Sequence, residues 1–182
     1  MIITTVTSEK ELDEIHALNK ASLKFNLSEE EKKQEGFVTW LYSPELLRQM
    51  HSLQPSIIAK DGDRVVGYAL VTPREARAFH KDLETMITHT QDIPYKGLPL
   101  IAHNYYIMGQ ICIDKDYRGK GLFRLLYEKH KELYSGKYDM LVTEVSTNNK
   151  RSQAAHEKVG FVTINTYPDA EDEWNVVVWD WR

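Results

Sequence analysis

The sequence predicts an α/β fold, a single domain in which helices flank a central sheet of about seven strands. Short apolar runs of strand length alternate along the chain with segments whose apolar residues recur at helical spacing. The 182 residues, 42% of them hydrophobic and 27% charged, suit one globular domain that buries roughly 70% of its unfolded surface. We therefore expect one domain, residues 1–182, without a second.

Helices in the first half of the chain begin with capping residues. Ser8 with Glu11 three residues later predicts a capping box. Ser43 followed by Pro44 predicts another start, because serine caps a helix and proline suits its first position. Ser28, also followed by glutamate after three residues, suggests a further start, although the surrounding charge run equally suits a solvated turn.

The same half contains three strand-like runs. Residues 1–6 form the first, and the runs at 56–60 and 64–71 flank Asp61-Gly62-Asp63. An Asp-Gly pair between two apolar runs is typical of a β-hairpin. We expect these strands to pair in the sheet.

Segment 72–103 reads as a helix followed by a loop. Thr72-Pro73 begins the predicted helix. Its apolar residues at helical spacing are Phe79, Leu83, Met86 and Ile87. Prolines and a glycine after residue 92 then favour an irregular loop up to residue 103.

Strands and helices alternate in the second half. Strands are expected at 105–113, 138–145, 162–167 and 175–181, and helices at 121–134 and 149–159. Gly109 within the first of these strands indicates a β-bulge. The first of these helices should turn four leucines inward, namely Leu122, Leu125, Leu126 and Leu133.

Composition excludes several classes of function. A formal net charge of −4 argues against a general nucleic-acid-binding protein. No apolar run approaches the roughly 20 residues that span a bilayer, and residues 1–6 lack the regions of a signal peptide. The single cysteine, Cys112, lies in an apolar strand and should be buried. We expect a cytoplasmic protein without membrane or nucleic-acid partners.

An anion-binding turn follows the apolar run Ile111-Cys112-Ile113. The segment Tyr117-Arg118-Gly119-Lys120-Gly121 connects this strand to a helix start, where free backbone N–H groups and the helix dipole favour an anion. Glycines allow a pyrophosphate to approach the main chain closely. The spacing fits neither a Walker loop nor a Gly-x-Gly-x-x-Gly fingerprint. The alternative is a simple turn that starts a helix.

Three motifs in order resemble the GCN5-related N-acetyltransferase superfamily. The pattern Arg118-x-x-Gly121-x-Phe123 is close to its Arg/Gln-x-x-Gly-x-Gly/Ala signature, and 138–145 reads as its fifth strand. The helix pattern Asn149-x-x-Ser152-x-x-x-His156-Glu-Lys-x-Gly-Phe follows in family register. The resemblance covers about residues 105 to 167 and implies a mixed sheet.

Two residues and one segment depart from the family pattern. Phe123 stands where the family prefers glycine or alanine, and His156 stands where it often has tyrosine. The family usually joins its third and fourth strands directly, so 72–103 resembles an insertion. It would either cover the acceptor groove or support the sheet.

The resemblance implies acetyl-CoA as the acyl donor. The pyrophosphate would lie on the turn, and the N–H groups of Ile111 and Ile113 would bond the acyl and pantetheine groups where two strands splay. Asn149 would either cap its helix or bond pantetheine. The implied cofactor-binding residues are Ile111, Cys112, Ile113, Arg118, Gly119, Lys120, Gly121, Leu122, Phe123, Asn149 and Ser152.

Two residues are candidates for proton transfer. Glu144 lies in Glu-Val-x-x-x-Asn, which resembles the base motif of protein N-terminal acetyltransferases; otherwise it is a surface carboxylate at a strand end. His156 would either protonate the CoA thiolate or pack under the CoA arm. His156-Glu157 lacks the second histidine of a zinc motif, so no metal is expected.

Several aromatic and polar residues are candidates for the acceptor side. His103, Tyr105, Tyr106 and Gln110 are candidates, with a loop histidine as the alternative reading of His103. The last strand carries three tryptophans, which suit the core or a homodimer surface. They are Trp174, Trp179 and Trp181.

The sequence thus predicts an acetyl-CoA-dependent N-acetyltransferase that transfers acetyl to an amine by direct attack in a ternary complex. The acceptor would be an amine-bearing small molecule or a protein, and a homodimer is possible. One alternative is a non-catalytic acyl-CoA-binding module. A second is an enzyme that uses a longer acyl-CoA.

Overall fold

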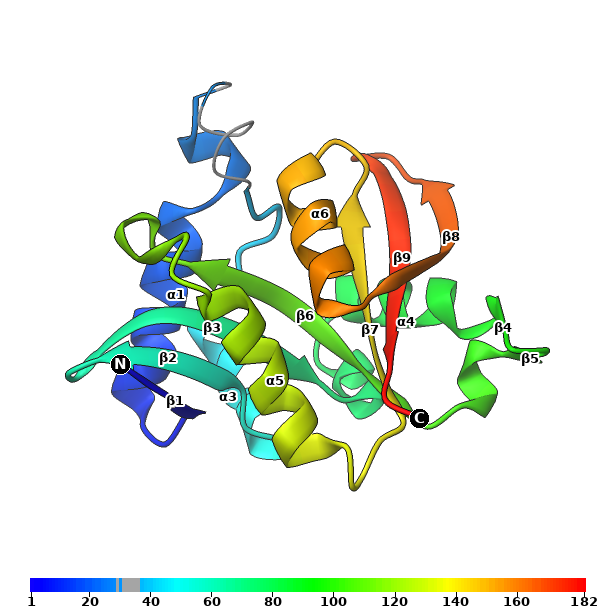
Figure 1. Cartoon of the computed structure of the whole chain (residues 1–182), viewed down its shortest axis with the longest axis horizontal. Helices are drawn as coiled ribbons and strands as arrows, with labels where there is room; N and C mark the ends of the chain where they lie inside the picture. Colours follow the sequence, from blue (N-terminus) through cyan, green and yellow to red (C-terminus); the bar gives the residue numbers. More distant parts are fainter. Residues whose placement is uncertain (29, 31–36) are drawn as a thin grey trace.

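A computed structural model describes residues 1–28, 30 and 37–182. A seven-stranded sheet runs through it in the order β1-β2-β3-β6-β7-β9-β8 (Figure 1). Its strands are β1 (Ile2–Thr5), β2 (Ile57–Asp61), β3 (Arg64–Thr72), β6 (Tyr105–Ile113), β7 (Met140–Ser146), β9 (Glu173–Asp180) and β8 (Val162–Pro168). Only β6 and β7 pair in parallel, so the prediction of a mixed seven-stranded α/β sheet is confirmed.

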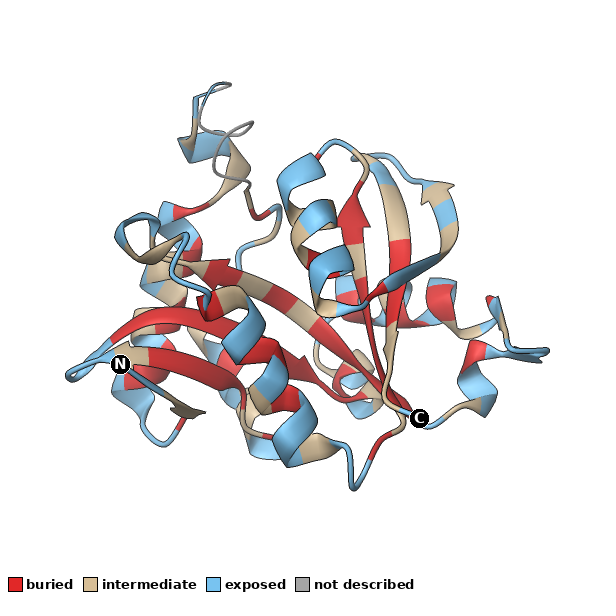
Figure 2. Ribbon diagram, viewed as in Figure 1, coloured by how far each residue is buried: buried red, intermediate tan, exposed pale blue. Residues whose placement is uncertain are grey.

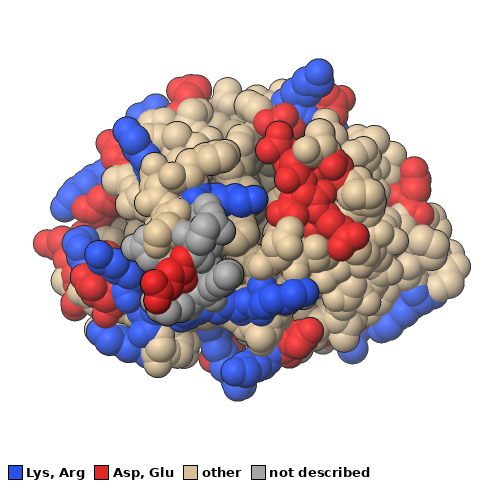
Figure 3. Space-filling model, turned by 90° about the horizontal axis from the view of Figure 1, so that it is seen from above, with Lys and Arg blue, Asp and Glu red and all other residues tan. Residues whose placement is uncertain are grey.

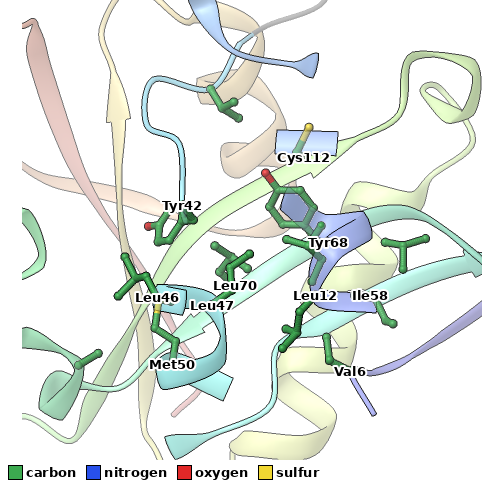
Figure 4. Close-up of a cluster of buried hydrophobic side chains, with 14 of the residues drawn as sticks. Val6, Leu12, Tyr42, Leu46, Leu47, Met50, Ile58, Tyr68, Leu70 and Cys112 are labelled. Carbon is green, nitrogen blue, oxygen red and sulfur yellow. The ribbon is translucent and has the colours of Figure 1, made fainter. Parts of the chain in front are cut away.

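Helices cover both faces of the sheet (Figures 1 and 2). Helices α1 (Glu9–Ala21) and α3 (Pro44–Leu53) pack with Tyr68 and Leu70 in one buried cluster (Figure 4). Helix α5 (Leu122–Tyr134) packs on the other face, against Ala69 and Val71 of the same strand. Alternate residues of β3 therefore enter opposite layers, as the strand period of two requires.

Short sequence patterns predicted several helix starts and one hairpin correctly. Ser8 and Glu11 form the predicted capping box, and the Ser43 hydroxyl accepts a hydrogen bond from the Leu46 amide. The β2–β3 hairpin turns at Gly62, whose φ is +58°. The start predicted at Ser28 extends into residues outside those described. Helix α6 (Lys150–Val159) follows β7 as predicted.

The segment between β3 and β6 differs from its prediction. A short 3₁₀ helix (Arg74–Ala78) precedes α4 (Lys81–Gln91), which His80 caps through the Asp82 amide, so the helix does not begin at Pro73. The expected irregular loop contains a small hairpin of β4 (Pro94–Tyr95) and β5 (Leu98–Pro99). Lys96 and Gly97 both have positive φ there, as a tight hairpin turn requires. Further 3₁₀ helices span Lys24–Asn26, Leu100–Ala102 and Lys115–Tyr117.

The inward face of α5 was predicted only in part. Leu122 and Leu126 are buried, but Leu125 and Leu133 are exposed. Tyr127 and His130 are buried in their place. The buried residues lie at i, i+4, i+5 and i+8 from Leu122, along one stripe of the helix.

An extended segment, residues 37–42, is tied to α1 and to β6 by side-chain hydrogen bonds. The Asn19 side chain donates to the Trp40 carbonyl at 3.0 Å and accepts from the Tyr42 amide at 2.8 Å. The Gln110 side chain also donates to the Trp40 carbonyl, at 2.9 Å. Because Asn19 is almost fully buried, these bonds replace hydrogen bonds that the segment would otherwise make with water.

None of the described helices has both the length and the apolar character needed to cross a membrane.

Asn19→Ala should destabilise the fold by about 2 kcal/mol, because it leaves the Trp40 carbonyl and the Tyr42 amide with fewer buried partners. Urea denaturation measures this loss. Asn26→Ala is the matched control, since its exposed amide donates only to the Lys20 carbonyl, and it should change stability by less than about 0.5 kcal/mol. Equal losses in the two variants would contradict the anchoring role of Asn19.

Candidate functional site

The site lies where β6 and β7 separate. They pair only from Tyr105 to Ile107 and from Met140 to Val142. One step further, the Thr143 hydroxyl donates to the Met108 carbonyl at 2.8 Å. Beyond that point β6 continues along β3 while β7 continues along β9, so a wedge opens within the sheet.

A β-bulge at Gly109 accompanies the separation, as predicted. The register between β3 and β6 shifts between Ala69 and Val71. A Cβ at Gly109 would lie 2.5 Å from the Thr72 hydroxyl oxygen and 2.7 Å from that of Tyr42. Only glycine fits here without displacing one of these side chains.

Backbone N–H groups of β6 face the wedge. The Asp114 amide bonds the Val66 carbonyl on β3, while the Ile113 carbonyl points away from β3 and accepts from Arg118 Nε at 2.9 Å. Since N–H directions alternate along a strand, the amides of Ile111 and Ile113 point toward the opening. They are available as donors to a ligand.

A cavity of about 390 Å³ lies between β6, the start of α5 and α6. Ten of the eleven predicted cofactor-binding residues line it, and Lys120 is the exception. Its ammonium group instead donates to the Asp116 carbonyl and lies over the Tyr117 ring. The further lining residues are Ser22, Phe37, Val38, Tyr117, Arg151, Ala155 and Lys158.

The turn before α5 has the geometry of an anion site. Gly119 and Gly121 have φ values of +74° and +79°, and a Cβ at either would meet open space. No side chain of the described residues caps the first turn of α5. Its free N–H groups and the dipole end therefore face the cavity.

Cationic side chains surround the same cavity. Arg118 was predicted, whereas Arg151 and Lys158 were not assigned to the site. Arg151, Ala155 and Lys158 are spaced at i, i+4 and i+7, which places them on one face of α6. That spacing was the signal in the sequence for a cationic helix face at the cavity.

The two departures from the family motifs contact each other. The Phe123 and His156 rings meet edge to face, with centroids 5.0 Å apart. Both rings also contact Tyr127. Phe123 thus fills space beside a histidine.

Asn149 caps α6, which is one of its two predicted roles. Its side-chain oxygen accepts from the Ser152 amide at 3.2 Å, and its Nδ2 donates to the Phe37 carbonyl at 3.1 Å. It lines the cavity as well. The amide therefore ties the helix start to the segment 37–42.

A second cavity of about 160 Å³ adjoins the first at the wedge. The two share five lining residues, namely Phe37, Val38, Ile111, Asn149 and Ser152. Glu144 and His156 line the second cavity, together with aromatic and sulfur-containing side chains. These are Trp40, Tyr42, Met86, Met108 and Trp174.

Glu144 is a partly buried carboxylate at this second cavity. The Tyr167 hydroxyl donates to its Oε1 at 2.6 Å. Burial raises the pKa of Glu144 above its usual 4.5 to about 7, and the nearby Asp169 carboxylate adds to the rise while the Tyr167 bond opposes it. A carboxylate with a pKa near neutrality is suited to general-base chemistry.

His156 has both ring nitrogens engaged. Nδ1 lies 2.7 Å from the Ser152 carbonyl, which can only accept, so Nδ1 carries the proton. Nε2 then accepts from the Tyr127 hydroxyl at 2.6 Å. Burial lowers the pKa of His156 to about 4. A neutral, hydrogen-bonded imidazole favours the packing role over the acid role.

The structure separates the acceptor-side candidates. Gln110 lines the second cavity, whereas His103, Tyr105 and Tyr106 do not. His103 bonds the Tyr95 carbonyl, in agreement with the loop reading, and both tyrosines belong to the core.

The three tryptophans of the last strand lie in two different environments. Trp179 and Trp181 pack against the core as expected, but Trp174 lines the second cavity. Trp40, Tyr42 and Met86 were missed because they come from the segment 37–42 and from α4, which only tertiary packing brings to the wedge.

The described residues contain no group of His, Cys, Asp or Glu side chains that could hold a metal ion. Cys112 is buried as predicted, and burial raises the pKa of its thiol. A buried, protonated thiol is a poor nucleophile.

A model of the acetyltransferase (GNAT) family matches residues 13–161, most of the chain. The chain belongs to this family. The predictions of a GNAT fold and of an acetyltransferase are thereby confirmed. No curated protein sequence matches the chain.

Solved structures share the GNAT fold over their whole length. The NatC complex bound to Gag peptide and CoA contains a chain 15% identical, with a TM-score of 0.66 and coverage of 100% of this chain and 98% of that one. A ribosomal-protein-alanine N-acetyltransferase from Brucella melitensis is 18% identical, with a TM-score of 0.64 and 99% coverage of both chains. A spermidine N-acetyltransferase variant from Vibrio cholerae is 14% identical, with a TM-score of 0.60 and coverage of 99% and 95%. At such identities the likeness establishes the fold.

Gly121→Ala should weaken binding of CoA by about tenfold, because an L-residue at this positive φ costs ~1–2 kcal/mol and reshapes the turn. Calorimetric titration with CoA measures the effect. Gly97→Ala is the matched control, since Gly97 has a φ of +83° and equally open surroundings. It should lose similar stability and keep its CoA affinity. Unchanged affinity in a folded Gly121→Ala variant would remove this turn from the CoA site.

Proposed function

We propose that this GNAT-family protein is an acetyl-CoA-dependent N-acetyltransferase in which Glu144 is the general base. The observation that carries the proposal is the position of Glu144. Its carboxylate, with a pKa near 7, lines a cavity that adjoins an anion-binding cavity at the separated ends of β6 and β7.

The residues of the larger cavity fit CoA. The amides of the turn from Gly119 to Phe123 would hold the pyrophosphate, with Arg118, Arg151 and Lys158 around it. The amides of Ile111 and Ile113 would bond the acyl carbonyl and pantetheine. Donors of this kind, aimed at a developing oxyanion, contribute roughly 3 kcal/mol at the transition state.

Acetyl-CoA would supply the activated acetyl group. Glu144 takes a proton from the ammonium group of the acceptor and so produces the neutral amine that attacks. This step is needed because an alkyl amine with a pKa near 10.4 is almost wholly protonated at neutral pH. The new C–N bond forms as the C–S bond breaks, and the electron pair leaves with sulfur. Solvent protonates the thiolate in this scheme, because the one proton of the neutral His156 ring is on Nδ1, where it is hydrogen-bonded to the Ser152 carbonyl.

The fold neighbours do not select the acceptor. Their names refer to a ribosomal-protein alanine in one case and to spermidine in another. The acceptor therefore has to be inferred from this chain's own second cavity.

A thiol-release assay with acetyl-CoA and a panel of amines tests the proposal. CoA release that depends on an amine supports it. Binding of acetyl-CoA without release from any amine would favour a non-catalytic binding module. Competition between acyl-CoA chain lengths separates acetyl transfer from use of a longer acyl group.

Glu144→Gln should lower kcat at neutral pH by about 10²- to 10⁴-fold with little change in CoA affinity. The wild-type rate should rise with pH through about 7, where Glu144 loses its proton, and the variant should lack this limb. The deficit should shrink at higher pH, where free amine accumulates. Glu132→Gln, on the exposed face of α5, is the control. A loss that is independent of pH would demote Glu144 to a structural role.

The same variant should be more stable than wild type above pH 7. The folded pKa of Glu144, about 7, exceeds its unfolded value near 4.5, so the folded state holds this proton more tightly. The contribution of this proton to the free energy of unfolding is fully present below pH 4.5 and is lost as pH rises through 7. Glutamine carries no such penalty. Thermal unfolding between pH 4 and 8 checks this, and parallel stability curves for the two proteins would contradict the burial of Glu144.

Met86→Ala should raise the KM for the acceptor several-fold and leave CoA affinity unchanged. Met86 is the one described residue of 72–103 that lines either cavity. The rest of α4 supports the core through Leu83 and Ile87, so removing the segment would test folding rather than the site. Leu98→Ala, an exposed change in the same segment, is the control. Unaltered acceptor kinetics in Met86→Ala would exclude this segment from the acceptor site.

A further inference from the structure

The two adjoining cavities differ in charge. Among the described lining residues, the larger cavity has Arg118, Arg151 and Lys158 and no carboxylate. The smaller cavity has Glu144 and no Lys or Arg. An anion suits the first and a cation suits the second.

An acidic turn adjoins the smaller cavity. The connection between β8 and β9 and the first residue of β9 carry four carboxylates within five residues, namely Asp169, Glu171, Asp172 and Glu173. Asp172 accepts from the Ser146 hydroxyl at 2.6 Å, and Ser146 lines the cavity. Asp169 lies close enough to Glu144 to act on its charge. Figure 3, a view from above, shows acidic side chains gathered in one compact group on this face.

The Tyr42 hydroxyl is a second indication of a ligand in the smaller cavity, and it does not depend on the acidic turn. Tyr42 is only 2% exposed and lines the smaller cavity. Its hydroxyl has no hydrogen-bond partner among the described residues, although it is not sealed from the cavity. In Figure 4 it points away from Tyr68 and Leu70. Because this hydroxyl opens to the cavity, its donor and acceptor positions are available to a ligand there.

The walls of the smaller cavity are apolar and aromatic. Trp40, Met86, Met108 and Trp174 surround the space between Tyr42 and Glu144. A volume of about 160 Å³ admits a short unbranched chain rather than a bulky ring system. Aromatic faces attract ammonium groups as well as alkyl chains.

We propose that the acceptor is an unbranched alkyl amine that carries a second cationic group. The inference rests on the proposed function and gives its substrate class. The reacting nitrogen lies between Glu144 and the Tyr42 hydroxyl, the alkyl chain lies along the aromatic walls, and the second ammonium group faces the carboxylates of 169–173.

Three acceptors of matched length test the inference, 1,4-diaminobutane, butylamine and 4-aminobutanoate. Each presents the same primary amine, and the tails carry charges of +1, 0 and −1. Wild type should prefer the diamine over butylamine by roughly tenfold or more in kcat/KM, with 4-aminobutanoate the poorest. Raising the ionic strength should shrink this preference.

The double variant Glu171→Gln/Glu173→Gln removes two exposed charges whose carboxylates form no hydrogen bond or ion pair with the described residues. It keeps the side-chain bonds of Asp169 and Asp172. It should reduce the preference for the diamine several-fold and leave the rate with butylamine unchanged. The control is Glu128→Gln/Glu132→Gln on α5, which changes the net charge equally and should keep the wild-type preference.

Each outcome bears on a different claim. Amine-dependent CoA release that ignores tail charge would overturn the inference and leave the acetyltransferase proposal intact. Release from none of the three amines would count against the proposed function. Calorimetric binding of the same three compounds would then decide the inference, and equal affinities would overturn it.

Discussion

The separation of β6 from β7 is the constraint on which the site depends. Three residue pairs join these strands, whereas β7 and β9 stay paired over seven. The bulge at Gly109 bends β6 away, and the absence of a Cβ there makes room for Tyr42 and Thr72. The separation of the two strands leaves the N–H groups of Ile111 and Ile113 unpaired, and it opens both cavities. A sheet paired along its full length would bury all of them.

Burial of polar groups around the wedge shifts their pKa values and lowers the stability of the fold. Burial is the largest cause of the raised pKa of Glu144 and of the lowered pKa of His156, so each favours its neutral form in the folded state. His156 is compensated by Tyr127 and the Ser152 carbonyl. Glu144 is compensated only in part, by Tyr167. The incompletely satisfied carboxylate faces the cavity, where a proton-donating amine would complete its partners.

Local signals in the sequence predicted what depends on neighbouring residues. The caps at Ser8 and Ser43, the hairpin at Gly62 and the turn before α5 are all set by backbone preferences over a few positions. The segment 37–42 and Met86 of α4 were not predicted as site residues. They reach the wedge only through long-range bonds, such as those of Asn19 and Gln110, and through packing that no local pattern encodes.

A crystal structure with acetyl-CoA bound tests the central role of the wedge most directly. We expect pyrophosphate oxygens within hydrogen-bond distance of the amides from Gly119 to Phe123. We also expect the thioester carbonyl at the Ile111 amide, between the unpaired parts of β6 and β7 and beside Glu144. A cofactor bound away from these strands, or strands that pair fully along the wedge in the complex, would contradict that role.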